Sequence, residues 1–235
     1  MIKRAIVKLS GEALAAGKKQ GIDFDLLDKA CAVLAKAAEE GYQIGVVVGA
    51  GNFWRGAKGD AKRMDRTRAD HMGMLATTMN AIAIGDALER AGAKAMVFSA
   101  TPMPAYLENY NPDKARKALD AGYIIVMGGG TGNPFVSTDT GIVLRALELK
   151  ADVALMAKNV DGVYDDDPNT NPNAKKFDKL TYKEVIDQNL KAIDLSASIM
   201  AQEGGLSCRV FELKTPESIL EVLHGAEVGT LLYQG

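Results

Sequence analysis

Short apolar runs alternate with longer helical segments along the chain, and this alternation constrains the fold more than any other feature of the sequence. Most of these runs are hydrophobic at consecutive rather than alternate positions, which is typical of parallel strands covered on both faces. We expect strands at residues 5–9, 43–48, 95–99, 123–127, 153–157 and 209–213. Helices are predicted at 25–40, 70–91 and about 139–149, with others beginning near Pro112 and Pro216. The sequence therefore predicts an α/β fold with an open, mainly parallel central sheet and helices on both faces.

Composition narrows the classes of function. A chain of 235 residues can bury one good core, so we expect residues 1–235 to form a single domain. The net charge is −2, without the basic excess that is typical of general nucleic-acid binders. No apolar run is long enough to cross a bilayer, and Lys8 and Glu12 interrupt the stretch that a signal peptide needs. Cys31 and Cys208 suit free, buried thiols rather than a disulfide framework or a zinc site. We expect a cytoplasmic protein that binds small molecules, and neither nucleic acid nor a membrane.

Glycine-rich segments follow three of the predicted strands. They are Ser10-Gly11, Gly49-Ala50-Gly51-Asn52 and the run from Gly128 to Asn133. In a parallel sheet these loops meet at the carboxyl edge, where backbone N–H groups can bind phosphate. One such cluster would mark only a turn, because glycine is common wherever a strand turns into a helix. Neither the Walker spacing nor the dinucleotide Gly-x-Gly-x-x-Gly spacing is present, so the three loops predict a phosphate site of another design.

Lys8 lies at the end of the first predicted strand, directly before Ser10-Gly11. A lone lysine at such a position can be a surface residue on an edge strand. Here the following glycine also permits a close backbone approach beside the ammonium group. A phosphoryl group in transfer needs a positive charge of this kind, so Lys8 is a candidate for the phosphate site.

Five segments, in order along the chain, resemble the bacterial uridylate kinases of the amino-acid kinase superfamily. They are residues 8–14, 51–56, 70–77, the group 132–135 with 138–139, and 160–164. The match extends over essentially the whole chain, and the segment 70–77 points to the uridylate branch. The resemblance implies an amino-acid kinase-like α/β/α sandwich in which the acceptor part is mainly N-terminal and the ATP part mainly C-terminal.

The resemblance also implies an activity and a set of site residues. The reaction is transfer of the γ-phosphoryl group of ATP to UMP, giving UDP and ADP in pyrimidine biosynthesis, with Mg²⁺ carried on ATP. The implied catalytic residues are Lys8, Arg55, Asp139 and Asp194. The implied ATP-binding residues are Lys8, Leu9, Ser10, Gly11, Gly51, Arg55, Lys158, Asn159, Tyr164 and Asp167, the choice between Lys158 and Asn159 staying open because this turn varies in length. The implied UMP-binding residues are Ala50, Asp70, Thr131, Gly132, Asn133, Pro134, Phe135, Val136, Ser137 and Thr138. No metal ligand is assigned to the protein.

The chain departs from the family pattern at Ala50, where the family usually has glycine. Alanine keeps the backbone N–H but disfavours a positive φ. We therefore predict an ordinary backbone conformation at this position.

Several conspicuous residues have a simpler interpretation than catalysis. We expect His71 to be a polar neighbour of a helix start, and the run Asp165 to Asp167 to be a solvated turn with one nucleotide contact. Basic residues between 58 and 68 form either a solvated face or a mobile cover over the phosphates. An apolar stripe at helical spacing indicates core or a subunit contact; it consists of Met72, Met74, Leu75, Met79 and Ile82.

Two other functions remain open. One is a different enzyme of the superfamily that phosphorylates a carboxylate or carbamate, and the other is a nucleotide-binding storage or regulatory protein on the same fold. The resemblance further implies a homohexamer that UTP inhibits and that GTP can activate. The segment 16–21 falls where the family varies in a region tied to the GTP response, so the GTP effect is not carried over.

Overall fold

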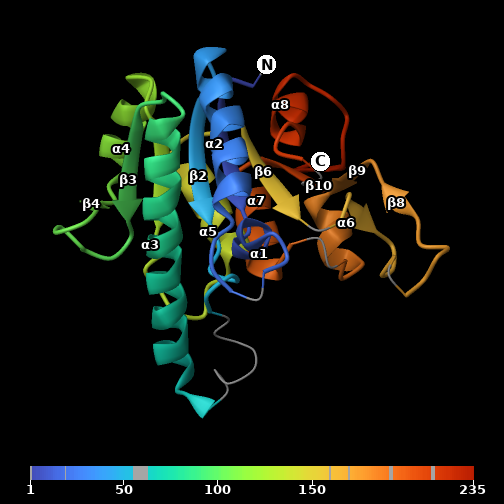
Figure 1. The fold of residues 1–235 in the computed structure, drawn as a ribbon. Coiled ribbons are helices and arrows are strands. Elements are labelled where there is room, and N and C mark those ends of the chain that lie inside the picture. Colours follow the sequence, from blue (N-terminus) through green and yellow to red (C-terminus); the bar gives the residue numbers. More distant parts are fainter. Residues whose placement is uncertain are drawn as a thin grey trace.

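The computed structural model describes residues 2–18, 20–54, 63–158, 160–168, 170–190, 193–212 and 215–235. Within these residues a nine-stranded sheet forms the centre (Figure 1), in the order β4-β3-β5-β2-β1-β6-β10-β11-β9. The strands are β1 (Arg4–Leu9), β2 (Gln43–Val48), β3 (Ala95–Ser99), β4 (Glu108–Asn109), β5 (Ile124–Gly128), β6 (Val153–Lys158), β9 (Lys179–Thr181), β10 (Ser207–Glu212) and β11 (Thr230–Tyr233). Neighbouring strands are parallel except β10 and β11, which are antiparallel. A separate antiparallel pair is formed by β7 (Val163–Tyr164) and β8 (Lys176–Phe177).

Helices cover both faces of the sheet. They are α1 (Gly11–Ala15), α2 (Phe24–Glu39), α3 (Arg66–Arg90), α4 (Pro112–Asp120), α5 (Thr138–Glu148), α6 (Tyr182–Asp187), α7 (Leu195–Glu203) and α8 (Ser218–Leu223). Side chains of α2, α3 and α8 share one apolar core with Ala5, Val7 and Leu9 of β1. Side chains of α4, α5, α6 and α7 share the opposite core with Ile6 of the same strand. Successive residues of β1 thus point to opposite faces, and both faces are buried. The predicted fold class is confirmed.

The helix ends follow local chemistry. Asp23 caps α2 by accepting from the Leu26 N–H at 3.1 Å, and Gly41 follows the helix with φ +95°. Gly92 follows α3 with φ +86°, which agrees with the predicted end of this helix at residue 91. The predicted start of α3 at residue 70 is wrong, because Asp65 is the cap and accepts from the Arg68 N–H at 3.2 Å. His71 therefore lies inside the helix, with an exposed side chain, and not at its start.

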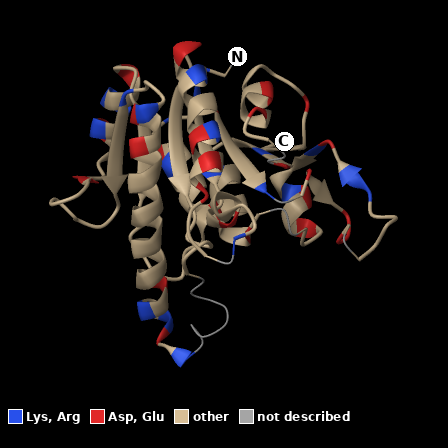
Figure 2. Cartoon of the chain, in the orientation of Figure 1, with Lys and Arg blue, Asp and Glu red and all other residues tan. Residues whose placement is uncertain are grey.

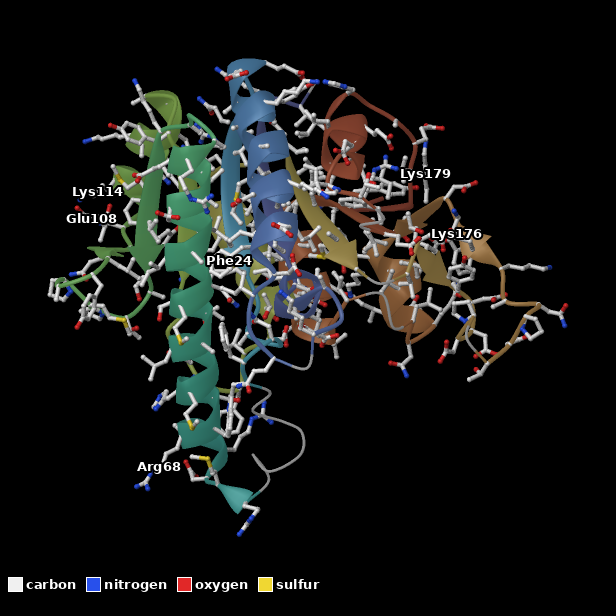
Figure 3. All side chains as sticks on the ribbon, viewed as in Figure 1. Phe24, Arg68, Glu108, Lys114, Lys176 and Lys179 are labelled. Atoms are coloured by element: carbon white, nitrogen blue, oxygen red, sulfur yellow. The ribbon has the colours of Figure 1, made fainter. Side chains whose placement is uncertain are left out.

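Charges mark the borders of the sheet and of α3. In the edge strand β4, Glu108 pairs with Lys114 of α4 at 2.6 Å (Figure 3), and a charged edge discourages pairing with another strand. Arg63, Arg66 and Arg68 are exposed around the beginning of α3, where Figure 3 labels Arg68. The predicted basic residues Lys58 and Lys62 lie outside the described residues. No described helix is both long enough and apolar enough to cross a membrane. Cys31 and Cys208 are free and buried, as expected.

Candidate functional site

A cavity of about 800 Å³ lies at the carboxyl ends of the central strands. Its wall includes Lys8 and Val48 from the ends of β1 and β2, and Lys158 from the end of β6. The start of α3 and the first turn of α5 close two other sides, through Asp70 and Thr138. Parallel strands therefore bring together segments that are far apart in the sequence, at the edge where open α/β sheets bind ligands.

The glycine segments after β1 and β2 approach each other so closely at this edge that a side chain would not fit between them. A methyl group on Gly11 would lie 2.5 Å from the Asn52 Oδ1 atom and 2.6 Å from the Gly51 nitrogen. A methyl group on Gly51 would lie 2.9 Å from the Glu12 Cγ atom. Neither glycine has a positive φ, so close approach rather than backbone conformation requires glycine here. Ala50 also has an ordinary backbone conformation, which confirms the prediction for this position.

The third glycine segment requires glycine for a different reason. Gly129, Gly130 and Gly132 have φ values of +76°, +58° and +83°, in the left-handed region that side chains disfavour. Gly130 and the following Thr131 contribute to the cavity wall. The loop after β5 thus bends into the site through a conformation that few sequences can adopt.

Asp139 pairs with two lysines on the cavity wall. Lys8 donates to one carboxylate oxygen, and the Lys158 Nζ atom lies 3.1 Å from the other. The three side chains are only 12 to 22% exposed. Burial opposes ionisation of Asp139, but the two ammonium groups outweigh it and hold the pKa of this carboxyl below its usual range. Burial lowers the pKa of Lys158, and Asp139 partly offsets that effect. These three side chains together carry a net positive charge, in a wall that also contains Glu12, Asp70 and Asp194.

Asp194 fixes the first turn of α5 against α7. It caps α7 by accepting from the Ala197 N–H at 2.8 Å, and it accepts from the Thr140 hydroxyl at the same distance. Its second oxygen accepts from the Ser137 hydroxyl. Ser137 in turn caps α5 by accepting from the Asp139 N–H at 3.0 Å. The amino end of α5, whose dipole favours anions, is thereby held in the cavity wall.

Asp70 contributes to the cavity wall from α3 and already accepts from two protein donors. The Arg66 Nε atom is 2.9 Å from both carboxylate oxygens, and the Phe135 nitrogen is 2.8 Å from one of them. Phe135 has a φ of +65° and an exposed ring, with the Arg66 guanidinium 5.4 Å from its centroid. These contacts connect the start of α3 to the loop after β5.

Most of the sequence-predicted acceptor residues line this cavity. Those in the wall are Ala50, Asp70, Thr131, Asn133, Val136, Ser137 and Thr138, whereas Gly132, Pro134 and Phe135 are not in it. Of the residues predicted for ATP, Lys8, Gly51 and Lys158 line the same cavity. Arg55 and Asn159 lie outside the described residues.

A second cavity, of about 390 Å³, follows directly after β6. Its wall includes Tyr164 and Asp167, which were also predicted for ATP, together with Asn189 and Leu190 after α6. The Tyr164 hydroxyl donates to the Asp161 carboxylate at 2.6 Å. Two other residues predicted for ATP line neither cavity. Leu9 is part of the apolar core, and the Ser10 hydroxyl caps α1 by accepting from the Ala13 N–H at 3.0 Å. Lys158, in the wall of the first cavity, is followed after one residue by Val160, in the wall of the second.

Sequence reasoning missed several polar residues that shape the site. The fully buried Asn80 of α3 donates to the Gly49 carbonyl at 2.8 Å and forms a reciprocal amide pair with Asn52. Trp54, the only tryptophan, lines the cavity and donates its indole N–H to the Ala69 carbonyl at 2.7 Å. A lone asparagine in the apolar run around position 80 was the available signal, because a buried polar group needs partners.

Three comparisons with known proteins agree with one another. Residues 3–212 match the model of the amino acid kinase family. The uridylate kinase of Pseudomonas syringae pv. syringae is 46% identical over 230 residues, which are 98% of this chain and 94% of that protein. The crystal structure of UMP kinase from Bacillus anthracis matches with a TM-score of 0.93 and 35% identity, covering 99% of this chain and 96% of that one. UMP kinase from Ureaplasma parvum matches with the same TM-score and 33% identity, covering 99% of both chains.

Proposed function

This chain belongs to the amino acid kinase family and, within it, to the uridylate kinases, and on that premise we propose that it transfers the γ-phosphoryl group of ATP to UMP. The products are UDP and ADP. The observation that carries the proposal is the cavity around Lys8, because it gathers the glycine loop after β2, the first turn of α5 and a pair of lysines at one edge of the sheet. A surface of this kind suits the triphosphate of ATP facing the single phosphate of UMP.

The chemistry requires little more than positioning and charge. The acceptor is a phosphate monoester whose second pKa is about 6, so at neutral pH it is mostly dianionic and needs no strong base. Two anions must instead be brought together in line while their repulsion is offset. Lys8 and Lys158 supply ammonium groups for this purpose, and the amino end of α5 adds its N–H groups. We assign Arg55 the same role on the strength of the resemblance alone.

The donor set of the site fits a Mg²⁺ ion that arrives with ATP. Asp139 is committed to two ammonium groups and Asp194 to three hydrogen-bond donors. Within the described ranges there is no group of three or more His, Cys, Asp or Glu side chains that could hold a metal. Mg²⁺ retains water and takes phosphate oxygens readily, so we treat it as part of the nucleotide substrate. When bound it neutralises phosphate charge.

The two cavities suggest how the nucleotides divide the site. We assign the adenosine of ATP to the smaller cavity with Tyr164 and Asp167, and the phosphates to the part of the larger cavity near Lys8 and Lys158. UMP then occupies the larger cavity beside Asp70 and the segment 131–138. Binding of a ribose hydroxyl by Asp70 would add to, or replace, its present bonds from Arg66 and Phe135. On this assignment the acceptor part is mainly N-terminal and the ATP part mainly C-terminal within one domain.

A homohexamer with UTP as inhibitor is part of the same proposal. The outer face of α3 supports a subunit contact, because Met72, Leu75, Met79 and Ile82 recur at helical spacing and are each 39 to 53% exposed. Figure 2 shows that the middle of this helix carries no charged residue. Sedimentation at several protein concentrations tests this part, and a monomer throughout would contradict it.

A coupled assay of ADP release tests the activity. We expect a strong preference for UMP over CMP, AMP, acetylglutamate and aspartate as acceptors. A preference for either carboxylate would support a different reaction of the superfamily. No turnover with any acceptor, together with tight nucleotide binding, would support a storage or regulatory protein. Either result would contradict the proposed function.

A further inference from the structure

The glycine loop after β5 needs anchors outside itself. Three of its residues, Gly129, Gly130 and Gly132, have positive φ values, and glycine has more backbone freedom than any other residue. Inside the loop, the Gly132 N–H donates to the Gly129 carbonyl at 3.0 Å. The other internal bonds join Thr131 and Asn133 at 3.3 to 3.5 Å. These bonds do not connect the loop to the rest of the fold, so its orientation depends on contacts with neighbouring elements. Two buried side chains from different helices supply such contacts.

The first anchor is the hydroxyl of Thr77 in α3. It accepts from the Gly129 N–H at 2.8 Å and donates to the Met74 carbonyl of its own helix at 2.7 Å. Thr77 also contributes to the cavity wall, but its hydroxyl proton is already used in the bond to Met74. Phosphate oxygens of UMP can only accept hydrogen bonds, so they have no donor to bind at Thr77. The role of this hydroxyl lies in holding Gly129.

The second anchor is the guanidinium of Arg145 in α5. Arg145 is the only charged residue in the buried class within the described ranges, and it is not part of the cavity wall. It donates to the Gly130 carbonyl at 3.2 Å and to the Glu148 carboxylate at 2.6 Å. Its central carbon lies 3.9 Å from the centroid of the Tyr110 ring, and the Tyr110 hydroxyl donates to the same carboxylate at 2.8 Å. A buried charge is costly unless it is fully partnered, and here the partners aim it at the loop.

We propose that Thr77 and Arg145 are positioning residues for the acceptor nucleotide. They hold Gly129 and Gly130 from two sides, and thereby set the direction in which Thr131 and the segment up to Thr138 enter the cavity. This inference rests on the proposed function, because it concerns the part of the site assigned to UMP. It predicts that losing either anchor weakens use of UMP without a comparable effect on ATP.

The neighbouring Thr78 provides a matched control for Thr77. Both residues are in α3, they are 6% and 5% exposed, and each donates its hydroxyl to a carbonyl of the preceding turn. Of the two hydroxyls, that of Thr77 also accepts a hydrogen bond from the Gly129 N–H of the loop. Valine keeps the shape of threonine and replaces the hydroxyl group with a methyl group. For Thr77→Val we expect the KM for UMP to rise about five- to tenfold, the range for one lost hydrogen bond, and the KM for ATP to stay within about twofold. For Thr78→Val both KM values should stay within about twofold.

Arg145→Lys tests the second anchor while keeping a cation beside Glu148. Lysine lacks the planar fork that reaches Glu148 and Gly130 together, so we expect about the same rise in the KM for UMP. Tyr110→Phe is its control, because it removes a bond to Glu148 and keeps the ring against the guanidinium; its KM for UMP should stay within about twofold.

Hydrogen exchange provides a readout that does not depend on activity. Thr77→Val and Arg145→Lys should speed amide exchange in residues 128–133 about tenfold or more, with the rest of α3 unchanged, and the two controls should not. Equal kinetics for Thr77→Val and Thr78→Val, or unchanged exchange of the loop in both anchor variants, would overturn the inference. If the unmodified protein does not phosphorylate UMP but the loop still loosens, the proposed function fails and the anchoring of the loop stands.

Discussion

Replacement of Lys8 by methionine tests the central charge of the site. Methionine keeps most of the length of the side chain and removes the ammonium group that donates to Asp139. An ammonium group about 4 Å from a phosphoryl oxygen contributes about 4 kcal/mol at an effective dielectric constant of about 20. Mutational losses of a single donor to a developing negative charge are about 2.7 to 4 kcal/mol, or 100- to 1000-fold in kcat. We expect a loss in this range.

The fold should survive this change. Removing one partner of a buried ion pair is strongly destabilising when the other charge is left alone, by about 3 to 5 kcal/mol. Asp139 keeps Lys158 at 3.1 Å, so we expect a smaller loss of about 1 to 2 kcal/mol in the free energy of unfolding. Unfolding in urea measures this quantity, and circular dichroism checks that secondary structure is retained.

The assay is steady-state kinetics of ADP release, with ATP and UMP varied separately. Lys183→Met is the matched control, because Lys183 also pairs with an aspartate, Asp187, but on the exposed surface of α6. It should leave kcat within about twofold. A folded Lys8→Met variant with kcat close to that of the unmodified protein would refute the role given to Lys8, whatever its stability.

Three further predictions concern the contacts that hold the site together. Asn80→Leu leaves the Gly49 carbonyl and the Asn52 amide without their buried partner. We therefore expect a loss of about 1 to 3 kcal/mol in the free energy of unfolding, measured in urea. An unchanged midpoint of urea unfolding would contradict the importance of the amide pair. Gly11→Ala places a methyl group 2.6 Å from the backbone of Gly51 and should lower the melting temperature, whereas Gly73→Ala, which meets only an ordinary contact of 3.7 Å, should not. Because the folded pKa of Asp139 lies below its ordinary value of 3.8, the carboxylate stabilises the fold above that pH, and the contribution is lost as the pH falls from 3.8 through the folded pKa. The destabilisation caused by Asp139→Asn should therefore be smaller at pH 3 than at pH 7, and a constant difference would contradict the ion-pair assignment.

The strands and long helices could be predicted because their cause is local. Runs such as Ile44 to Val48 are apolar at every position except Gly45, and that pattern already implies burial on both faces. The beginning of α3 could not be predicted in the same way, since Arg66 and Arg68 are exposed and this first turn shows no apolar period. The short α6 also gave a local signal that was not used, a capping box formed by Thr181 and Glu184.

The anchors of the glycine loops depend on contacts that the sequence does not display. Asn80 meets the Gly49 carbonyl across 31 residues, and Arg145 meets the Gly130 carbonyl across 15. Both partners are backbone carbonyl groups. Every residue has such a group, so the sequence does not indicate which one is bound. A polar residue in an apolar helix can be recognised as requiring a partner, but only the folded chain identifies the partner.

Asp139 and Asp194 are two of the four acidic residues among the described residues of the cavity wall, and beside the proposed phosphates they would repel the ligand unless their charges were partnered within the protein. The resemblance predicted that Asp139 and Asp194 organise the charged centre, and their contacts explain why the site tolerates them. Asp139 is outnumbered by two ammonium groups, one of which comes from a residue 131 positions earlier in the chain. Asp194 accepts from the first turn of α7 and from two hydroxyls of α5, and it also favours the charged form of Lys158. On the proposed assignment of phosphates to this part of the cavity, each acid therefore holds in place a lysine or a helix end that can offset phosphate charge.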